Sequence, residues 1–143
     1  MVAIDGWTAE MRAAEVLSKL MISALPVDPF SIADAKGIEH KQNPALKPGI
    51  SGCLMKVGDV FGILFSARFP SEGFRRFTVA HELGHYFLDG HVQYLFRDGQ
   101  HFHESQSGFT SDDKYEREAD SFAAALLMPK QLFKLPAKAQ VKA

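Results

Sequence analysis

Two histidines and a glutamate, His81, Glu82 and His85, form an HExxH motif. In a helix of about 3.6 residues per turn, residues four apart lie on one face, so both imidazoles can reach the same metal ion. Glu82 stands beside them and can accept a proton from a water molecule that the ion activates. The motif therefore predicts a catalytic metal site, and its imidazole and carboxylate groups suit zinc or manganese.

The motif lacks one ligand, because a catalytic zinc usually has three protein ligands and keeps its fourth position for water. His91 is one candidate, since it follows His81 at the spacing of the third histidine of metzincins. The glycine that the metzincin turn requires is replaced here by Leu88. Glu116 and Glu118 are the other two candidates.

Helix geometry separates these two glutamates. In a helical projection Glu116 falls within the apolar side, Asp120 lies at its edge, and Glu118 falls outside it. Burying a carboxylate costs free energy unless the carboxylate is paired with a cation. We therefore expect Glu116 to pair with a cation, either a metal or an arginine such as Arg75. Asp120, one turn further on, could hold a ligand histidine through its second ring nitrogen.

Capping residues and apolar spacing predict the elements that position these groups. In chain order they are a helix over 9–24 capped by Thr8, a helix over 29–35 capped by Asp28, a strand over 38–42, a hairpin of strands 53–57 and 60–65, the HExxH helix capped by Ser71 and ended by Asp89-Gly90, a lid or loop over 91–111, and a helix over 113–128 capped by Ser111 or Asp112. They predict an α+β fold in which a small antiparallel sheet packs with the HExxH helix and a second helix that carries Glu116.

Length and composition are those of one globular domain over residues 1–143. The net charge of −1 gives no broad basic field, so direct nucleic-acid binding is not expected. The longest apolar run is too short for a membrane span, and residues 1–10 lack a secretory pattern, so we expect a cytoplasmic protein. The only cysteine, Cys53, is expected to be a buried strand residue. The oligomeric state is not indicated.

Two further polar stretches are expected to be solvent-exposed segments without a binding role. Lysines recur every fourth residue in the tail over 130–143, which is expected to be a solvated helical or frayed end. The cluster over 101–104 contains two histidines and a glutamate, and we interpret it as solvated loop side chains rather than a second metal site.

The stretches 76–85 and 116–129 together resemble the ImmA/IrrE family of metallopeptidases. The resemblance implies a zincin-like domain in which His81, His85 and Glu116 bind zinc and Glu82 is the catalytic base. Asp120 stands where many members have asparagine. Known members cleave helix-turn-helix repressors in stress responses or mobile-element control, which implies a DNA-binding repressor as the protein substrate.

Two functions are consistent with these residues. One is a zinc endopeptidase, and the other is a metal-binding sensor or toxin–antitoxin partner that cuts no peptide. Glu82 favours the endopeptidase, because a structural zinc needs no base. Substrate is expected to lie along an edge of the 51–69 sheet, at Val60–Phe65. During peptide hydrolysis negative charge develops on the oxygen of the scissile carbonyl, and we expect one side chain to stabilise this oxyanion together with the metal. Five side chains remain open for that role: Tyr86, His91, His101, His103 and Tyr115.

Overall fold

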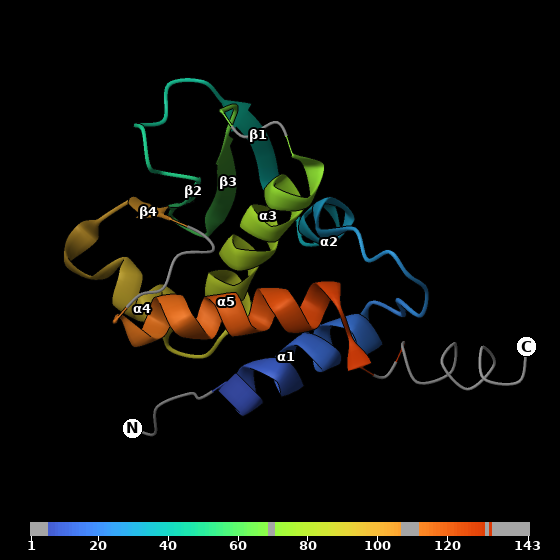
Figure 1. Cartoon of the computed structure of the whole chain (residues 1–143). Coiled ribbons are helices and arrows are strands. Elements are labelled where there is room, and N and C mark those ends of the chain that lie inside the picture. The colour runs from blue at the N-terminus through green and yellow to red at the C-terminus, as the bar shows by residue number, and fades with distance from the viewer. Residues whose placement is uncertain (1–5, 69–70, 107–111, 131, 133–143) are drawn as a thin grey trace, which may run out of the picture.

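The computed structural model describes residues 6–68, 71–106, 112–130 and 132 (Figure 1). The predicted cap Ser111 and the tail lysines beyond Lys130 lie outside these residues. In chain order the elements are α1 (Gly6–Lys19), α2 (Pro29–Ala35), β1 (Glu39–Asn43), β2 (Gly52–Val57), β3 (Val60–Ser66), α3 (Glu72–Phe87), α4 (His91–Leu95), the 3-10 turn η1 (Arg97–Gly99), β4 (Phe102–Ser105) and α5 (Lys114–Leu127).

The four strands form one sheet in the order β1-β3-β2-β4. β2 pairs antiparallel with both β3 and β4, so the predicted hairpin is confirmed. β1 pairs parallel with β3. The chain runs through β2 after β1, and β3 then returns antiparallel to β2 and lies beside β1. The sheet is therefore mixed: it is antiparallel as expected over β2, β3 and β4, and only the pairing of β1 with β3 is parallel.

The prediction of a lid or loop over 91–111 is also wrong, because its described part contains α4, η1 and β4. β4 has only four residues, and its hydrogen-bonding partner β2 lies far away in the sequence. Short strands of this kind depend on such a distant partner rather than on local apolar alternation. β4 occupies an edge of the sheet, whereas β3 is paired on both sides.

Helix α1 ends at Lys19, earlier than predicted. The Met21 N–H bonds to the Ser18 carbonyl at 3.0 Å and the Ile22 N–H to the Leu17 carbonyl at 2.9 Å, with Met21 at a φ of 59°. This is a Schellman ending, in which glycine usually takes the left-handed position. Methionine in that position hid the helix end from sequence reasoning.

Capping was predicted correctly at α2 and α3 but not at α1, where the predicted cap Thr8 lies inside the helix. Asp28 accepts the Phe30 N–H at 2.9 Å and Ser71 accepts the Phe74 N–H at 3.2 Å, as expected. At α5 the cap is Asp113, which accepts the Tyr115 N–H at 2.8 Å, so that helix begins slightly later than predicted.

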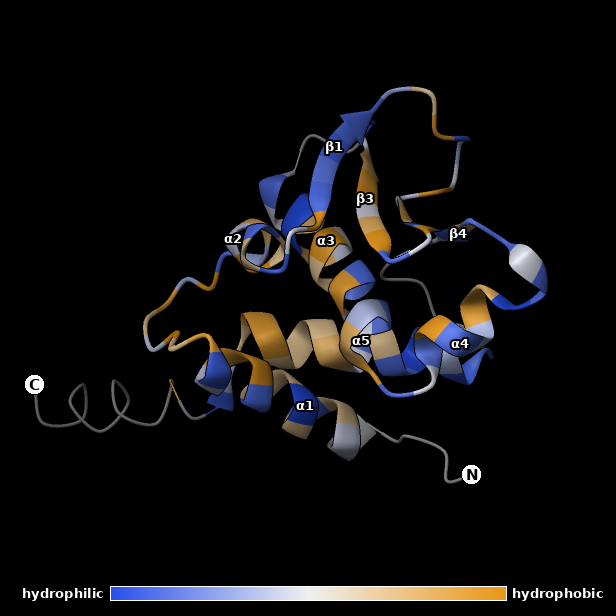
Figure 2. Ribbon diagram, turned by 180° about the vertical axis from the view of Figure 1, so that it is seen from behind, coloured by the Kyte–Doolittle hydropathy of each residue, from blue (hydrophilic) through white to orange (hydrophobic). Residues whose placement is uncertain are grey.

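Helix α3 is the centre of the molecule, because it packs against β2 and β3 on one side and α5 on the other. α1 covers the far side of α5, and α2 packs on α3 beside the sheet (Figure 1). Apolar segments of β3, α3 and α5 face this interior, whereas β1 is hydrophilic (Figure 2). The predicted burial of the HExxH helix is confirmed, since Val79, Ala80 and Leu83 are fully buried.

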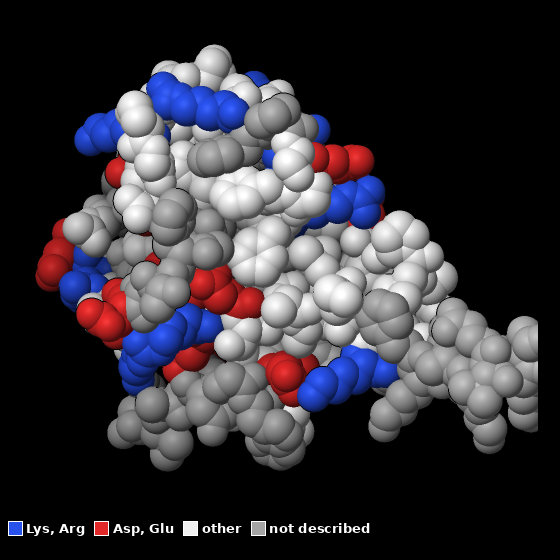
Figure 3. All heavy atoms as spheres, viewed as in Figure 1, with Lys and Arg blue, Asp and Glu red and all other residues white. Residues whose placement is uncertain are grey.

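The surface agrees with the near-zero net charge. On the face shown in Figure 3, the described acidic and basic side chains are interspersed, and no broad basic area gathers there. None of the described helices combines the length and the apolar character that a membrane span needs.

Candidate active site

Three side chains from two helices converge where α3 crosses α5. His81 Nε2 lies 3.0 Å from Glu116 Oε1, and His85 Nε2 lies 3.1 Å from Glu116 Oε2. The ligand atoms of these three residues all lie within 4.8 Å of one another. Of the three candidates for the third ligand, the structure therefore brings Glu116 to the HExxH histidines.

Close packing of the two helices makes this approach possible. A Cβ added at Gly84 would lie 3.1 Å from both Cα and O of Ala119 and 3.2 Å from the ring of Phe122. The glycine between the two motif histidines thus allows the α5 backbone to approach α3 at the level of the site. Glu116 then lies within reach of both imidazoles.

His81 is held from both sides of its ring. Its Nδ1 lies 2.7 Å from Asp120 Oδ1, the contact expected of a carboxylate that orients a ligand histidine. Burial would lower the pKa of His81, but the hydrogen bonds to Asp120 and Glu116 outweigh it and raise the pKa to about 10. The ring nitrogen that faces Glu116 must lose any proton it carries before it can bind a metal, so metal binding at His81 competes with protonation.

Glu82 is fully buried beside these groups. The Ser105 hydroxyl is the one side-chain hydrogen-bonding neighbour of its carboxylate among the described residues, and their contact is too loose to meet strict hydrogen-bond geometry. Burial raises its pKa to about 7, although the nearby charges of His81 and His103 act in the opposite direction. A carboxylate with a near-neutral pKa is suited to accept and return a proton at physiological pH.

His85 contacts a second buried pair that the sequence did not reveal. Its Nδ1 lies 2.9 Å from His91 Nδ1, and His91 Nε2 lies 2.8 Å from Glu118 Oε1. Glu118 was expected on the polar side of its helix, but it is only 5% exposed because α4 places His91 over that side of α5. Burial lowers the pKa values of His85, to about 3, and of His91.

His103 also reaches the site, contrary to its interpretation as a solvated loop residue. It lies on β4 opposite Leu54, and its Nε2 is 2.8 Å from Glu116 Oε2. Burial would raise the pKa of Glu116, but the contacts with His103, His81 and His85 hold it well below its usual range. Only the pairing of β4 with β2 places His103 here, so no local signal distinguished it from the other candidates for the oxyanion donor.

The residues fit a metal ion. Two imidazole nitrogens and one carboxylate oxygen are the His₂Glu set of many catalytic zinc sites. His85 Nε2 is buried without a hydrogen bond, although it lies close to Glu116. Such an orphaned acceptor is expected where a lone pair points at an ion rather than at a donor. The group can therefore bind a metal, with Asp120 supporting His81.

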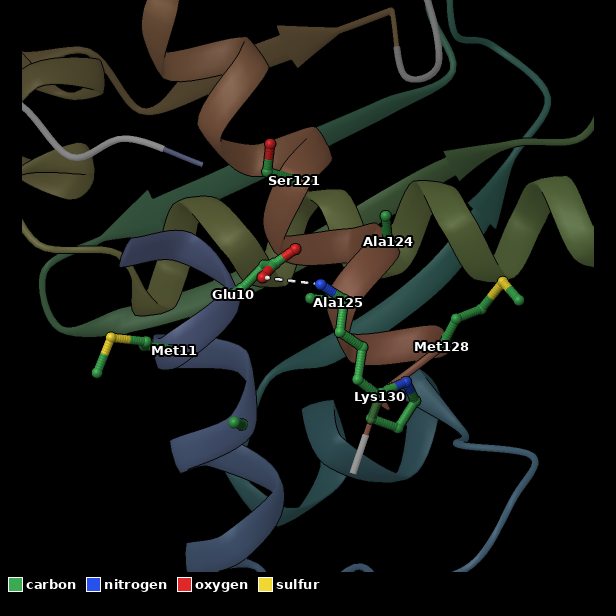
Figure 4. Close-up of a pocket in the computed structure, with 9 residues that line it drawn as sticks. Glu10, Met11, Ser121, Ala124, Ala125, Met128 and Lys130 are labelled. Carbon is green, nitrogen blue, oxygen red and sulfur yellow. Dashed lines mark ion pairs between the residues drawn. The ribbon is translucent and has the colours of Figure 1, made fainter. Parts of the chain in front are cut away.

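A cavity of about 540 Å³ between α1 and α5 lies apart from these residues (Figure 4). Met11 and Met128 flank it, and its two charged groups, Glu10 and Lys130, form an ion pair at 3.8 Å. It contains no histidine or unpaired carboxylate, so its described lining offers no catalytic group.

Comparison with known families agrees with this geometry. The model of the M78 peptidase family, described as the IrrE N-terminal-like domain, matches residues 61–142. The matched stretch contains both helices of the site and covers more than half of the chain, which confirms the ImmA/IrrE resemblance and the zincin-like α+β fold. No curated protein matches the chain significantly. The chain therefore belongs to the M78 peptidase family, as a protein with an IrrE N-terminal-like domain.

Proposed function

We propose that this protein is a zinc-dependent endopeptidase. The proposal depends on one observation: the His81, His85 and Glu116 group lies beside Glu82, a fully buried carboxylate that is not one of the three ligands. A structural zinc usually has four protein ligands and needs no base. Three ligands with a free carboxylate beside them are the arrangement that metal-assisted hydrolysis requires.

In the proposed reaction the proton is transferred by a side chain of the protein. A zinc ion held by the three ligands would supply Lewis acidity that activates water and polarises the scissile carbonyl. Glu82 accepts the proton of the attacking water and passes it to the leaving amine. Asp120 keeps His81 oriented, and burial raises the pKa of Glu82, which favours its taking up a proton.

His103 is the second oxyanion donor that we assign among the five open candidates. Its ring centroid lies 5.0 Å from that of His85, and it is partly exposed on the β4 side of the site. Tyr115 stacks on Tyr94 at 4.0 Å, and His101 bonds to the Lys56 carbonyl. An imidazole N–H beside the ligand group can hydrogen-bond to negative charge that develops on the substrate oxygen.

We place the substrate along β4. The expected edge at Val60–Phe65 is not available, because β3 is paired with β1 on one side and β2 on the other. Among the described residues, β4 has a strand partner on one side only, and it carries His103 towards the ligand group. An extended peptide that pairs with this edge would pass along the strand that carries His103.

As the substrate we propose an intracellular helix-turn-helix repressor, as in the known members of the family that this chain resembles. The test incubates zinc-loaded protein with the repressor encoded beside its gene and, separately, with a peptide library made from a cellular proteome. We expect Glu82→Gln to retain zinc and to lower the cleavage rate by about 10²–10⁴-fold. The matched control is Glu39→Gln, at an exposed carboxylate on β1, which should leave cleavage unchanged.

Each outcome of this test is informative. Cleavage by Glu82→Gln at the wild-type rate would overturn the assignment of the base. If wild-type protein cleaves neither the repressor nor the library, the endopeptidase proposal is wrong, and a metal-binding sensor or toxin–antitoxin partner becomes the better description. Cleavage of library peptides without cleavage of the repressor would keep the chemistry and reject the substrate.

A further inference from the structure

Three buried side chains from three helices form a chain of hydrogen bonds behind the ligand group. His85 of α3 contacts His91 of α4 at 2.9 Å through their Nδ1 atoms, and His91 Nε2 contacts Glu118 of α5 at 2.8 Å. Both histidines are fully buried, and Glu118 is nearly so. Burying a carboxylate and two imidazoles is costly, so their mutual hydrogen bonds must compensate for the lost solvation.

The donors and acceptors in this chain can be assigned by counting protons. An ionised carboxylate only accepts, so the proton of His91 lies on Nε2 and is donated to Glu118. His91 Nδ1 is then an acceptor, and the facing His85 Nδ1 must be the donor. A neutral His85 with its proton on Nδ1 has a bare lone pair on Nε2, the atom that lies 3.1 Å from Glu116. The chain therefore selects the His85 tautomer that can bind a metal.

We propose that His91 and Glu118 are positioning residues that fix the tautomer and ring orientation of His85 for metal binding. This inference rests on the metal site of the proposed function, but it makes no use of peptide cleavage. It assigns to His85 the kind of support that Asp120 provides for His81, through an intervening histidine instead of direct contact. His91 is thus a support for a ligand and not the third ligand that its spacing suggested.

Aromatic contacts hold His91 in place. Its ring meets Tyr115 edge-on at 5.0 Å, and Tyr115 stacks on Tyr94 at 4.0 Å with an interplanar angle of 8°. Tyr94 belongs to α4 and Tyr115 to α5, so this stack docks the short helix that carries His91 onto the helix that carries Glu118. Because His91 is held firmly, the hydrogen-bonded chain from Glu118 through His91 can fix the orientation of His85, whereas a mobile His91 could not.

The first test measures zinc affinity by competition with a chromogenic chelator. We expect His91→Leu to bind zinc about 10–100-fold more weakly than wild type, the usual loss when the partner of a ligand histidine is removed. Glu118→Gln should give a smaller loss, because its amide oxygen still accepts from His91. The matched control is His40→Leu, which breaks the 3.0 Å contact between His40 and Asp34 away from the site and should leave affinity unchanged. A folded His91→Leu protein with wild-type affinity would overturn the proposal.

The second test uses wild-type protein, so it stands even if His91→Leu fails to fold. Long-range ¹H–¹⁵N NMR spectra locate the imidazole protons in the metal-free and the zinc-loaded protein. We expect protons on His85 Nδ1 and His91 Nε2 in both the metal-free and the zinc-loaded protein. A proton on His91 Nδ1 would refute the proposed hydrogen-bonded chain. Failure of the endopeptidase proposal is recognised separately, as zinc binding with the expected tautomers but no cleavage of any peptide.

Discussion

Gly52 of β2 lies against Glu82, so its replacement by alanine tests the geometry around the proposed base. A Cβ at this position would lie 2.6 Å from Thr78 Cγ2 and 2.9 Å from Glu82 Oε2. Carbon atoms in good contact are about 3.5–4.0 Å apart, so the strand or the α3 side chains must move by about 1 Å. Both neighbours are buried, which leaves them little room to yield.

Two effects are expected from Gly52→Ala. Overpacking a buried site of this kind lowers the free energy of unfolding by about 1–3 kcal/mol, which outweighs the roughly 0.5–1 kcal/mol that alanine gains over glycine in a strand. A displacement of about 1 Å in a catalytic group lowers activity by about 10²-fold. Zinc affinity should stay within a few-fold of wild type, because the three atoms nearest to the added Cβ belong to Thr78, Glu82 and Leu64 and not to a proposed ligand.

The assays are chemical denaturation, zinc competition, and cleavage at matched zinc occupancy. Gly62→Ala is the control, since its Cβ would meet only the flexible end of Met55 at 2.9 Å and the Glu39 carbonyl at 3.7 Å. It should be near wild type in all three measurements. If folded Gly52→Ala cleaves substrate at the wild-type rate, the placement of Glu82 against β2 is wrong.

Three more predictions concern the thiol, the metal and the strand histidine. Burial, with the charge of Glu82 in addition, raises the pKa of Cys53 to about 12. The native thiol should therefore resist iodoacetamide at pH 8.5, and labelling should increase only as the pH rises towards 12. Labelling of the native protein as fast as that of the denatured chain would contradict this. Removing zinc with a chelator should lower the melting temperature, because zinc at 1,000 times its dissociation constant stabilises the folded state by about 4 kcal/mol; an unchanged melting temperature would show that zinc is not bound there. His103→Gln should lower kcat by about 10²–10³-fold with a smaller change in zinc affinity, and unchanged kcat in single-turnover cleavage would exclude His103 as an oxyanion donor.

Local patterns in the sequence predicted the parts of the fold that depend on neighbouring residues. The hairpin, the caps of α2 and α3 and the burial of α3 follow from residues close together in the chain, and the structure confirms them. The failures at β1 and β4 have one physical cause, because strand pairing depends on partners that are distant in sequence. The early end of α1 has another, because Met21 takes a conformation that usually requires glycine.

The active site divides in the same way. HExxH needs only the helical repeat to bring His81 and His85 to one face, and the apolar spacing of α5 turns Glu116 inward, so the sequence alone predicted the three residues that the structure brings together as a candidate metal site. The partners of that group depend on how separate elements pack. The crossing of α3 and α5 at Gly84, the pairing of β4 with β2 and the docking of α4 place Glu116, His103 and the His91–Glu118 pair around it. Only the tertiary structure decided these contacts, because no periodicity within one segment encodes which face of another segment it will meet.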